Sequence, residues 1–241
     1  MKNLLIYINP RGDFDEEGKV LIKIQIDNSY SLGWKPDDIM LFTNFPYEYN
    51  GIKANIIDGS SYSDISSKTV TISHLFDLNI IQDELYWVHD LDAFQNNIIT
   101  ESELELDNID FAITDYGRLL RWSGGSIFFK KSSKDIFKMI KEKVYEMNTT
   151  EEKALKKITD WNINNVNPRI KKLNISYNFQ MGNVNNCYPV AVKPIKVLHF
   201  HPFRDWKGRN TLDFFLRGKN KINTMLMEDR LVKIFNKYSI V

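Results

Sequence analysis

Short apolar runs alternate with longer segments over the first hundred residues of the chain. The short runs have the length of buried strands, and the longer segments repeat apolar residues at the spacing of one helix face. We expect strands at residues 3–9, 38–44, 54–58 and 85–89, and helices at residues 13–34 and 68–81. Strands that alternate with helices are typical of a parallel sheet, so this part of the chain predicts an α/β fold.

The rest of the chain has a more mixed pattern. We expect strands at residues 111–114, 125–130 and 196–199, and helices at residues 133–147, 150–161 and 220–237. Residues 162–196 are rich in asparagine and contain three prolines, so they are expected to be irregular. The chain is predicted to form one domain, residues 1–241, with a mostly parallel central sheet flanked by helices and a more irregular C-terminal half.

The composition fits a folded protein and narrows the classes of partner. Of the 241 residues, 43% are hydrophobic, which excludes a disordered chain. Lys and Arg number 32 against 31 Asp and Glu, so no stable nucleic-acid partner is expected, because that affinity depends largely on phosphate neutralisation. No apolar run reaches the ~18–20 residues of a membrane helix. The one cysteine, Cys187, cannot form an intramolecular disulfide, and we expect a cytoplasmic protein without a signal peptide.

The sharpest chemical signal is a pair of carboxylates at the end of a predicted strand. Residues 85–89 form an apolar run that leads directly into Asp90 and Asp92. Ligands bind at the carboxyl ends of strands in open α/β sheets, and carboxylates at this spacing can converge on one Mg²⁺ or Mn²⁺ ion. An ordinary acidic turn shows the same short pattern, but its place after an apolar strand favours a metal site.

A second signal lies late in the chain, where His199 ends a predicted strand and Arg204, Lys207 and Arg209 follow. Neutral imidazole is a ligand for Mn²⁺-like ions, and the basic residues could hold an anionic leaving group. Taken alone, this segment is better explained by a core histidine and a solvated basic surface. The carboxylate pair is what favours the interpretation as a metal ligand.

Two further segments could contribute to a site. Gly124 and Gly125 permit either a close backbone approach or a positive φ. Glu151 and Glu152 follow two threonines at the start of a predicted helix, where helix capping alone would explain acidic residues. The chain contains no P-loop, no dinucleotide-binding glycine motif, no nucleophile elbow and no array of zinc ligands, which excludes the enzyme classes that need them.

Taken in order, these motifs resemble those of glycosyltransferases with the GT-A fold. The shared order is an N-terminal strand and loop, Asp90-Leu-Asp92 after a strand, the Gly-Gly segment, an acidic helix start, and a late Val-x-His-Phe followed by Trp and Lys. The segments Gln25–Trp34 and Thr43–Tyr47 are also similar to small viral or phage-type members of this class. The resemblance covers most of residues 3–210.

The resemblance assigns roles in a metal site. Asp92 matches the aspartate that binds the metal directly, and Asp90 matches the one that reaches the ribose or, through water, the metal. His199 matches the late histidine that completes the site. The implied cofactor is Mn²⁺ or Mg²⁺, and the implied partners are a nucleotide-sugar donor and an acceptor hydroxyl on a glycan or another molecule. Residues 1–100 would form the nucleotide-binding half, and residues 101–241 the acceptor side with a C-terminal helix.

The resemblance also assigns donor-binding residues. Asn9 and Arg11 match the loop that lines the nucleoside pocket, and Lys68 stands at the start of the helix that leads into the Asp-x-Asp strand. Lys207 lies where related enzymes place a lysine on the donor diphosphate. This chain has Arg-Asp-Trp-Lys where they often have Lys-Pro-Trp, so one of the two nearby arginines could serve instead.

The implied reaction is the transfer of a sugar, with UDP favoured over GDP as its carrier. Negative charge develops on the departing diphosphate, and a divalent ion with a Lys or Arg would stabilise it. The donor sugar is expected above Gly124 and Gly125. An inverting enzyme needs a carboxylate that takes the proton of the acceptor hydroxyl, and Glu152 and Asp115 are the candidates, with Glu151 beside them. The acidic pair favours an inverting over a retaining reaction.

Two other functions remain open at this point. A nucleotidyltransferase that acts on a sugar phosphate also pairs carboxylates around a metal, but it needs a third carboxylate and a phosphate-binding loop near the N-terminus. A catalytically inactive, carbohydrate-binding relative would have no use for metal ligands, and the presence of Asp90, Asp92 and His199 argues against it.

Overall fold

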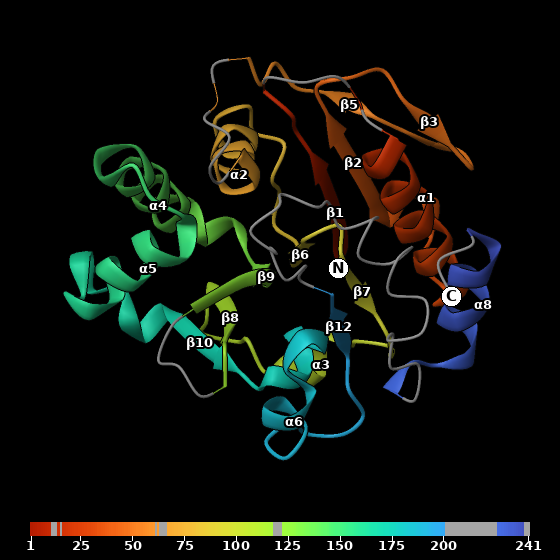
Figure 1. The fold of residues 1–241 in the computed structure, drawn as a ribbon. Coiled ribbons are helices and arrows are strands. Elements are labelled where there is room, and N and C mark those ends of the chain that lie inside the picture. Colours follow the sequence, from red (N-terminus) through yellow and green to blue (C-terminus); the bar gives the residue numbers. More distant parts are fainter. Residues whose placement is uncertain are drawn as a thin grey trace.

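A seven-stranded sheet lies at the centre of the protein in a computed structural model, which describes residues 1–10, 14, 16–60, 62, 67–117, 122–200 and 226–238. The strands stand in the order β10-β8-β9-β6-β1-β2-β5 (Figure 1). Their bounds are β1 (Lys2–Tyr7), β2 (Ile39–Thr43), β5 (Asn55–Ile56), β6 (Tyr86–His89), β8 (Phe111–Asp115), β9 (Trp122–Phe129) and β10 (Ile170–Leu173). Neighbouring strands are parallel, except that β9 runs antiparallel to both β6 and β8.

Helices cover both faces of this sheet. Helices α2, α4 and α5 lie on one side, and α1 and α8 lie on the other (Figure 1). The described helices are α1 (Glu16–Ser31), α2 (Ser67–Asp77), α3 (Glu101–Leu104), α4 (Lys134–Met147), α5 (Glu151–Asp160), α6 (Val184–Cys187) and α8 (Asp229–Lys237). Short 3-10 turns occur at Pro36–Asp38, Lys131–Ser133, Ile163–Asn165, Asn167–Arg169, Ile175–Asn178 and Met181–Asn183.

A smaller sheet joins residues 179–199 to residues 93–95 in the middle of the chain. Its strands are β7 (Ala93–Gln95), β11 (Phe179–Gln180) and β12 (Val197–His199), in the order β11-β12-β7. The antiparallel pairing of β12 with β7 sets His199 opposite Ala93. It therefore brings His199 next to the loop that follows β6. A separate hairpin consists of β3 (Glu48–Tyr49) and β4 (Ile52–Lys53).

Side chains of the central strands alternate between two buried faces. Leu4 and Val88 pack in the core beneath α2, α4 and α5. Leu5 packs on the opposite face against Ile22 of α1, and Trp87 packs there toward the smaller sheet. Because both faces are covered, these strands need apolar residues at successive positions, which explains the continuous apolar runs in the sequence.

The predicted fold class is confirmed: a mostly parallel sheet is flanked by helices. Three local predictions need correction. Residues 170–173 form the edge strand β10, although they lie in a segment that is expected to be irregular. Strand β9 begins at Trp122, so Gly124 and Gly125 lie within the strand and not just at its start. Of the helix expected at residues 220–237, residues 220–225 lie outside the described residues, residues 226–228 are not α-helical, and α8 begins at Asp229.

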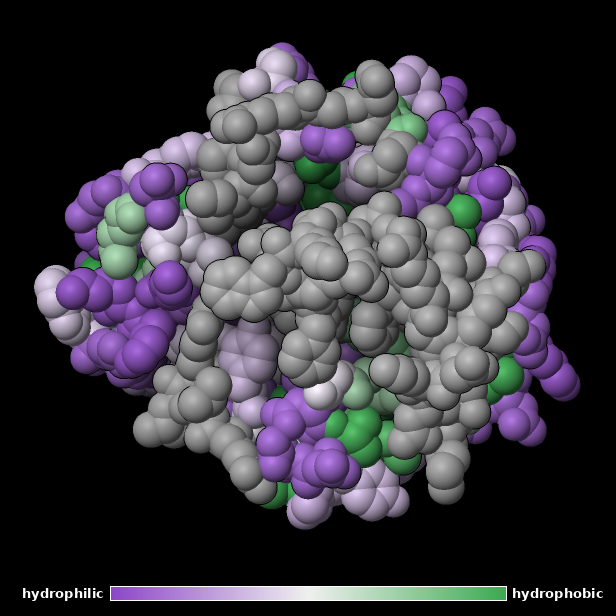
Figure 2. All heavy atoms as spheres, in the orientation of Figure 1, coloured by the Kyte–Doolittle hydropathy of each residue, from purple (hydrophilic) through white to green (hydrophobic). Residues whose placement is uncertain are grey.

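The surface follows from the two covered faces. On the side seen in Figure 2, hydrophilic residues gather over α4 and α5 and over α1 and α8. Most apolar residues of these helices are buried, for example Ile140 of α4 and Leu231 of α8, whereas Tyr145 and Met147 at the end of α4 are exposed. Within the described ranges, no helix is both long enough and apolar enough to cross a membrane.

Candidate metal centre

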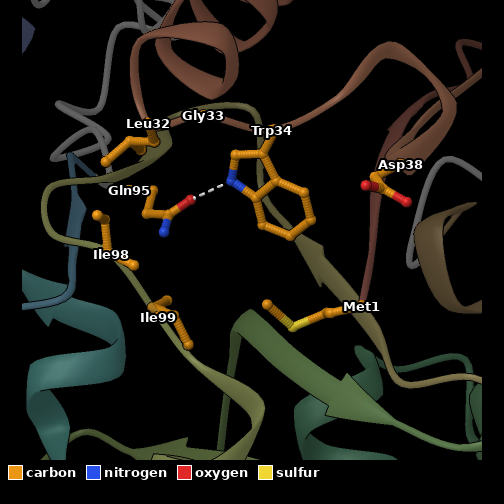
Figure 3. A pocket seen from close by; sticks show the side chains of 8 residues that line it. All are labelled: Met1, Leu32, Gly33, Trp34, Asp38, Gln95, Ile98 and Ile99. Carbon is orange, nitrogen blue, oxygen red and sulfur yellow. Dashed lines mark hydrogen bonds between the residues drawn. The ribbon is translucent and has the colours of Figure 1, made fainter.

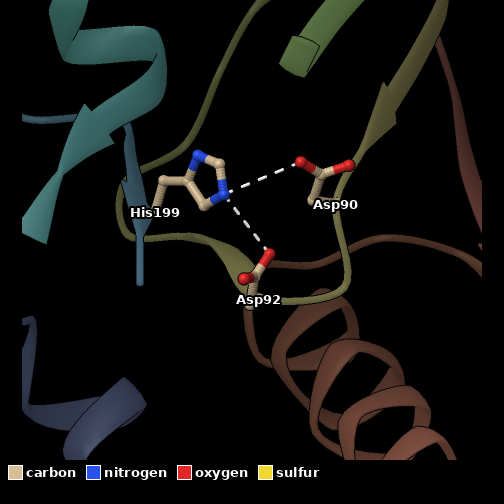
Figure 4. A group of neighbouring side chains, drawn as sticks. All are labelled: Asp90, Asp92 and His199. Atoms are coloured by element: carbon tan, nitrogen blue, oxygen red, sulfur yellow. Dashed lines mark ion pairs between the residues drawn. The ribbon is translucent and has the colours of Figure 1, made fainter. Parts of the chain in front are cut away.

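Three residues from two distant parts of the chain meet at the carboxyl end of β6. Asp90 and Asp92 lie in the loop between β6 and β7, and His199 ends β12. His199 Nε2 lies 3.3 Å from Asp92 Oδ1 and 3.7 Å from Asp90 Oδ2 (Figure 4). One ligand atom from each residue lies within 4.8 Å of the others. The structure thus brings together the three residues that the sequence proposes as metal ligands.

Backbone hydrogen bonds fix the loop that carries the two aspartates. The N–H of Asp90 donates to the carbonyl of Gly125 at 3.0 Å, and the N–H of Ala93 donates to the carbonyl of Asp90 at 2.9 Å. The N–H of Phe200 donates to the carbonyl of Asp92, also at 2.9 Å. The last bond ties the end of β12 to the loop, so His199 and Asp92 are held together through the main chain as well as through their side chains.

The donor set suits a divalent cation. Two carboxylates and one imidazole provide the oxygen and nitrogen ligands that Mn²⁺ accepts, and Mg²⁺ shares the preference for carboxylates. Burial opposes a charge on His199, but Asp92 and Asp90 outweigh it and raise the pKa of the imidazole above its ordinary value. The local field is therefore negative enough to attract positive charge, which is what a cation site requires.

Lys68 connects the acidic loop, residues 90–92, to Gly124 of β9 and Glu151 of α5. It is the second residue of α2, and its Nζ lies 2.5 Å from Asp90 Oδ1, 2.5 Å from the carbonyl oxygen of Gly124 and 3.5 Å from Glu151 Oε1. Burial opposes its charge, but Asp90 and Glu151 raise the pKa of Lys68 above its ordinary value, so it stays protonated. One oxygen of Asp90 is therefore engaged by Lys68, which distinguishes Asp90 from Asp92.

Gly124 and Gly125 lie where the register between β8 and β9 breaks. Ile113 pairs with Ile127, but the next residue of β8 pairs with Ser123. A Cβ at Gly124 would lie 2.7 Å from Glu151 Oε1, and one at Gly125 would lie 2.4 Å from the ring of His199. Neither glycine has a positive φ. The two glycines are therefore needed for the close approach of neighbouring side chains and not for a positive φ.

The acidic start of α5, Glu151 and Glu152, adjoins Gly124. Glu152 Oε1 accepts a hydrogen bond from the Tyr116 hydroxyl at 2.6 Å and another from the N–H of Gly124 at 3.1 Å. Asp115, the other candidate base, ion-pairs with Lys172 and accepts from the N–H of Gly117. Neither of these partners lies in the loop that carries Asp90 and Asp92.

Of the residues expected to bind the nucleoside and the diphosphate of the donor, Asn9, Arg11 and Lys207, the structure describes only Asn9. Asn9 follows β1, and its backbone exchanges hydrogen bonds of 3.0 and 2.9 Å with the side chain of Asn44, which follows β2. Since β1 and β2 are parallel to β6, Asn9 lies at the same edge of the sheet as Asp90. Arg11 and Lys207 lie outside the described residues, as do the two arginines near Lys207.

Comparisons with known proteins agree on the fold. The galactosyltransferase LgtC, solved with donor and acceptor sugar analogs, matches 98% of this chain and 96% of its own, with a TM-score of 0.62 at 12% identity. A glycosyltransferase involved in glycosylation of the major capsid of PBCV-1 matches 84% of this chain and 95% of its own, with a TM-score of 0.56 at 13% identity. The chain has the GT-A fold.

A third match has the same fold but a longer chain. The glycosyltransferase GlyE of Streptococcus pneumoniae TIGR4 matches 99% of this chain with a TM-score of 0.58 at 13% identity, and the match spans 64% of GlyE. No protein-family model matches the sequence, and no curated protein matches it. Identity this low establishes the GT-A fold, whereas the activity has to be argued from the site.

Sequence reasoning missed Gln180, which contacts His199 in this cluster. Gln180 is buried on β11, and its side-chain amide lies 3.2 Å from His199 Nδ1. The structure places the amide nitrogen of Gln180 toward Nδ1. With the amide turned over, its oxygen would instead accept the Nδ1 proton and leave Nε2 as the ligand atom facing Asp92. Strand β11 has two residues and lies in an asparagine-rich segment, so no periodicity marks this glutamine.

A surface cavity of about 230 Å³ lies away from the site. Figure 3 shows its lining, in which Trp34 Nε1 donates to Gln95 Oε1 at 2.8 Å. Met1, before β1, also lines it, whereas Asp90 follows the parallel strand β6. The cavity is therefore at the opposite edge of the sheet and contains none of the predicted site residues.

His89 supports the acidic loop from within the core. The ring stacks on Trp87 with centroids 4.0 Å apart, and its Nδ1 lies 3.0 Å from the carbonyl oxygen of Asp90. Its Nε2 lies 3.1 Å from Asn3 Oδ1. Burial lowers the pKa of His89 to about 4, so the ring is neutral at pH 7.

We predict that His89 titrates near pH 4 in the folded protein, as measured by NMR of the ring. The unfolded chain takes up this proton near the ordinary pKa of 6.5, whereas the folded chain does so only near pH 4. Above pH 6.5, His89 is neutral in both states and protonation does not lower the free energy of unfolding. The free energy of unfolding declines as the pH falls from 6.5 toward 4, by up to about 1.4 kcal/mol per pH unit. A His89→Gln variant should lack this component in its free energy of unfolding. Titration of His89 near 6.5 would contradict the account.

Proposed function

We propose that this GT-A protein is a metal-dependent glycosyltransferase that moves a sugar from a nucleotide-diphosphate sugar to an acceptor hydroxyl. The observation that carries the proposal is the convergence of Asp90, Asp92 and His199 at the carboxyl edge of the sheet, beside Lys68. The matched structures support it, since LgtC was solved with donor and acceptor sugar analogs. We propose UDP ahead of GDP as the carrier.

The metal ligands in this proposal are Asp92 and His199, with Asp90 at their side. Mn²⁺, or Mg²⁺ in its place, would supply positive charge for the diphosphate as it departs from the sugar. Asp92 and His199 face each other directly, and the main-chain bond from Phe200 to Asp92 preorganises them. Asp90 gives one oxygen to Lys68, which suits a role toward the ribose or toward a metal-bound water.

The donor sugar is proposed to lie beside Gly124 and Gly125, between the metal ligands and the start of α5. Glycine at these positions lets Glu151 and His199 approach the strand more closely than a Cβ would allow. Lys68 pairs with both Asp90 and Glu151, so it holds these two carboxylates close to one another beside the proposed sugar position. Preorganised charges of this kind stabilise a transition state without reorganisation during the reaction.

Glu152 is proposed as the base of an inverting reaction. Tyr116 and the N–H of Gly124 orient its carboxylate, and it lies in the first turn of α5 beside the proposed sugar position. A positioned carboxylate can take the proton of an acceptor hydroxyl as that oxygen attacks the sugar. Asp115 is the second candidate, but its pairing with Lys172 engages its charge elsewhere.

The metal dependence of nucleotide binding tests the proposal. UDP or GDP should bind at least tenfold more tightly with Mn²⁺ than with EDTA in calorimetry. Asp92→Asn keeps the shape of the side chain but removes the charged ligand, so it should lose this difference and reduce donor turnover at least ~100-fold. Asp77→Asn, which changes an exposed carboxylate paired with Lys134 at the end of α2, should behave as wild type. Equal affinity with and without metal would refute the metal–diphosphate site.

The role of Glu152 is tested against its neighbour. Glu152→Gln should lower the rate of sugar transfer by about 10²–10⁴ and leave donor affinity within about twofold, because a base acts only in the chemical step. Glu151→Gln should instead weaken donor binding, because Glu151 is paired with Lys68. The anomeric configuration of the product, followed by NMR, should be inverted. Transfer by Glu152→Gln at the wild-type rate would remove Glu152 from the mechanism.

A further inference from the structure

A buried glutamine of α1 binds the backbone of the acidic loop. The side-chain amide of Gln25 donates to the carbonyl oxygen of Leu91 at 2.8 Å and to that of Ala93 at 2.9 Å. Both partners are carbonyl oxygens, so only the nitrogen end of the amide can face them. The residue is 1% exposed, so these bonds form away from solvent.

The two acceptors flank Asp92 in the chain. One bond holds the residue before it, and the other holds the residue after it, so the amide of Gln25 spans the segment that aims the Asp92 carboxylate. From the other side, the N–H of Phe200 binds the carbonyl of Asp92 at 2.9 Å. The backbone of Asp92 is therefore held between α1 and the end of β12, the strand that carries His199.

A glutamine at this position has a cost that packing alone does not explain. A polar amide loses hydration when it is buried, whereas an apolar residue of the same size would gain stability in this helix, whose neighbouring positions Ile24 and Ile26 are fully buried. What the amide adds is a pair of hydrogen bonds to the carbonyl oxygens on either side of Asp92, which would otherwise lose this partner. The glutamine thus serves the geometry of the loop.

We propose that Gln25 is a positioning residue for the metal centre: it holds Asp92 in the orientation from which the carboxylate can bind a cation. Gln25 reaches the site only through the backbone of Leu91 and Ala93. The inference rests on the proposed function, because it requires that Asp92 be a metal ligand.

The same helix offers a matched control. Asn28 lies three residues later and is also 1% exposed, and its amide donates to the carbonyl oxygen of Gln95 at 2.9 Å. That acceptor is the last residue of β7, three residues beyond Asp92 and not adjacent to it. The side-chain oxygen of Asn28 also accepts from Arg230 at 2.6 Å, so its removal disturbs at least as many bonds as removal of the Gln25 amide. The two amides differ in whether they bind the segment around Asp92.

The experiment compares Gln25→Met and Asn28→Leu in the full chain. Mn²⁺ affinity is measured from the EPR signal of free Mn²⁺, and thermal stability is measured alongside. Gln25→Met should weaken Mn²⁺ binding about 10–100-fold, the range for groups that orient metal ligands. Asn28→Leu should lower the melting temperature at least as much but keep Mn²⁺ affinity within about twofold. Wild-type affinity in Gln25→Met, or equal losses in both variants, would overturn the inference.

A measurement on the wild type covers the case in which Gln25→Met does not fold. On titration with Mg²⁺, which is diamagnetic, the side-chain amide resonances of Gln25 should shift together with the backbone amide of Asp92 and more than those of Asn28. A shift at Asp92 without one at Gln25 would overturn the inference alone. If the wild type binds neither Mn²⁺ nor Mg²⁺, the proposed metal function fails, and the role of Gln25 fails with it.

Discussion

The antiparallel pairing of β12 with β7 is the constraint on which the site depends. It sets His199 opposite Ala93 and lets the N–H of Phe200 bind the carbonyl of Asp92. A residue near position 200 thereby meets a loop near position 90. The loop itself spans only Asp90–Asp92 between two strands, so its side chains have little freedom to move apart. A site held this way has its ligands in place before a cation arrives, which lowers the entropy lost on binding.

Charge follows from the same geometry. The loop and the start of α5 bring the carboxylates of Asp90 and Glu151 near Lys68, while Asp92 faces His199. Like charges that are partly buried, as these are, raise the free energy of the folded state unless a positive group lies between them. Lys68 meets this need on one side of the site. On the other side His199 does so only when it is protonated, and a divalent cation would do so more fully. The cost of gathering these acids is thus what would give the proposed site its affinity for a cation.

The sequence allowed much of this site to be predicted, for physical reasons. An apolar strand buried on both faces leaves a continuous run, so the position of Asp90 and Asp92 at its end could be predicted. His199 could be predicted from a second short run. By contrast, β7 has three residues and β11 has two, too few for a periodic pattern, so the pairing that unites the site was not predictable. Strand β10 was missed because Lys171 and Lys172 suit an exposed edge but weaken an apolar pattern.

Polar residues that act through the backbone leave even less trace. Gln25 lies on a helix whose apolar residues show its buried face, and nothing in the spacing tells a glutamine that binds a loop from one that faces solvent. The central claim is that Asp92 and His199 hold one divalent cation, and anomalous diffraction from crystals grown with Mn²⁺ and a nucleoside diphosphate tests it most directly. The account predicts a manganese peak within coordination distance of an Asp92 carboxylate oxygen and His199 Nε2. It would be contradicted by bound nucleotide with no manganese there and with Asp92 and His199 still in direct contact.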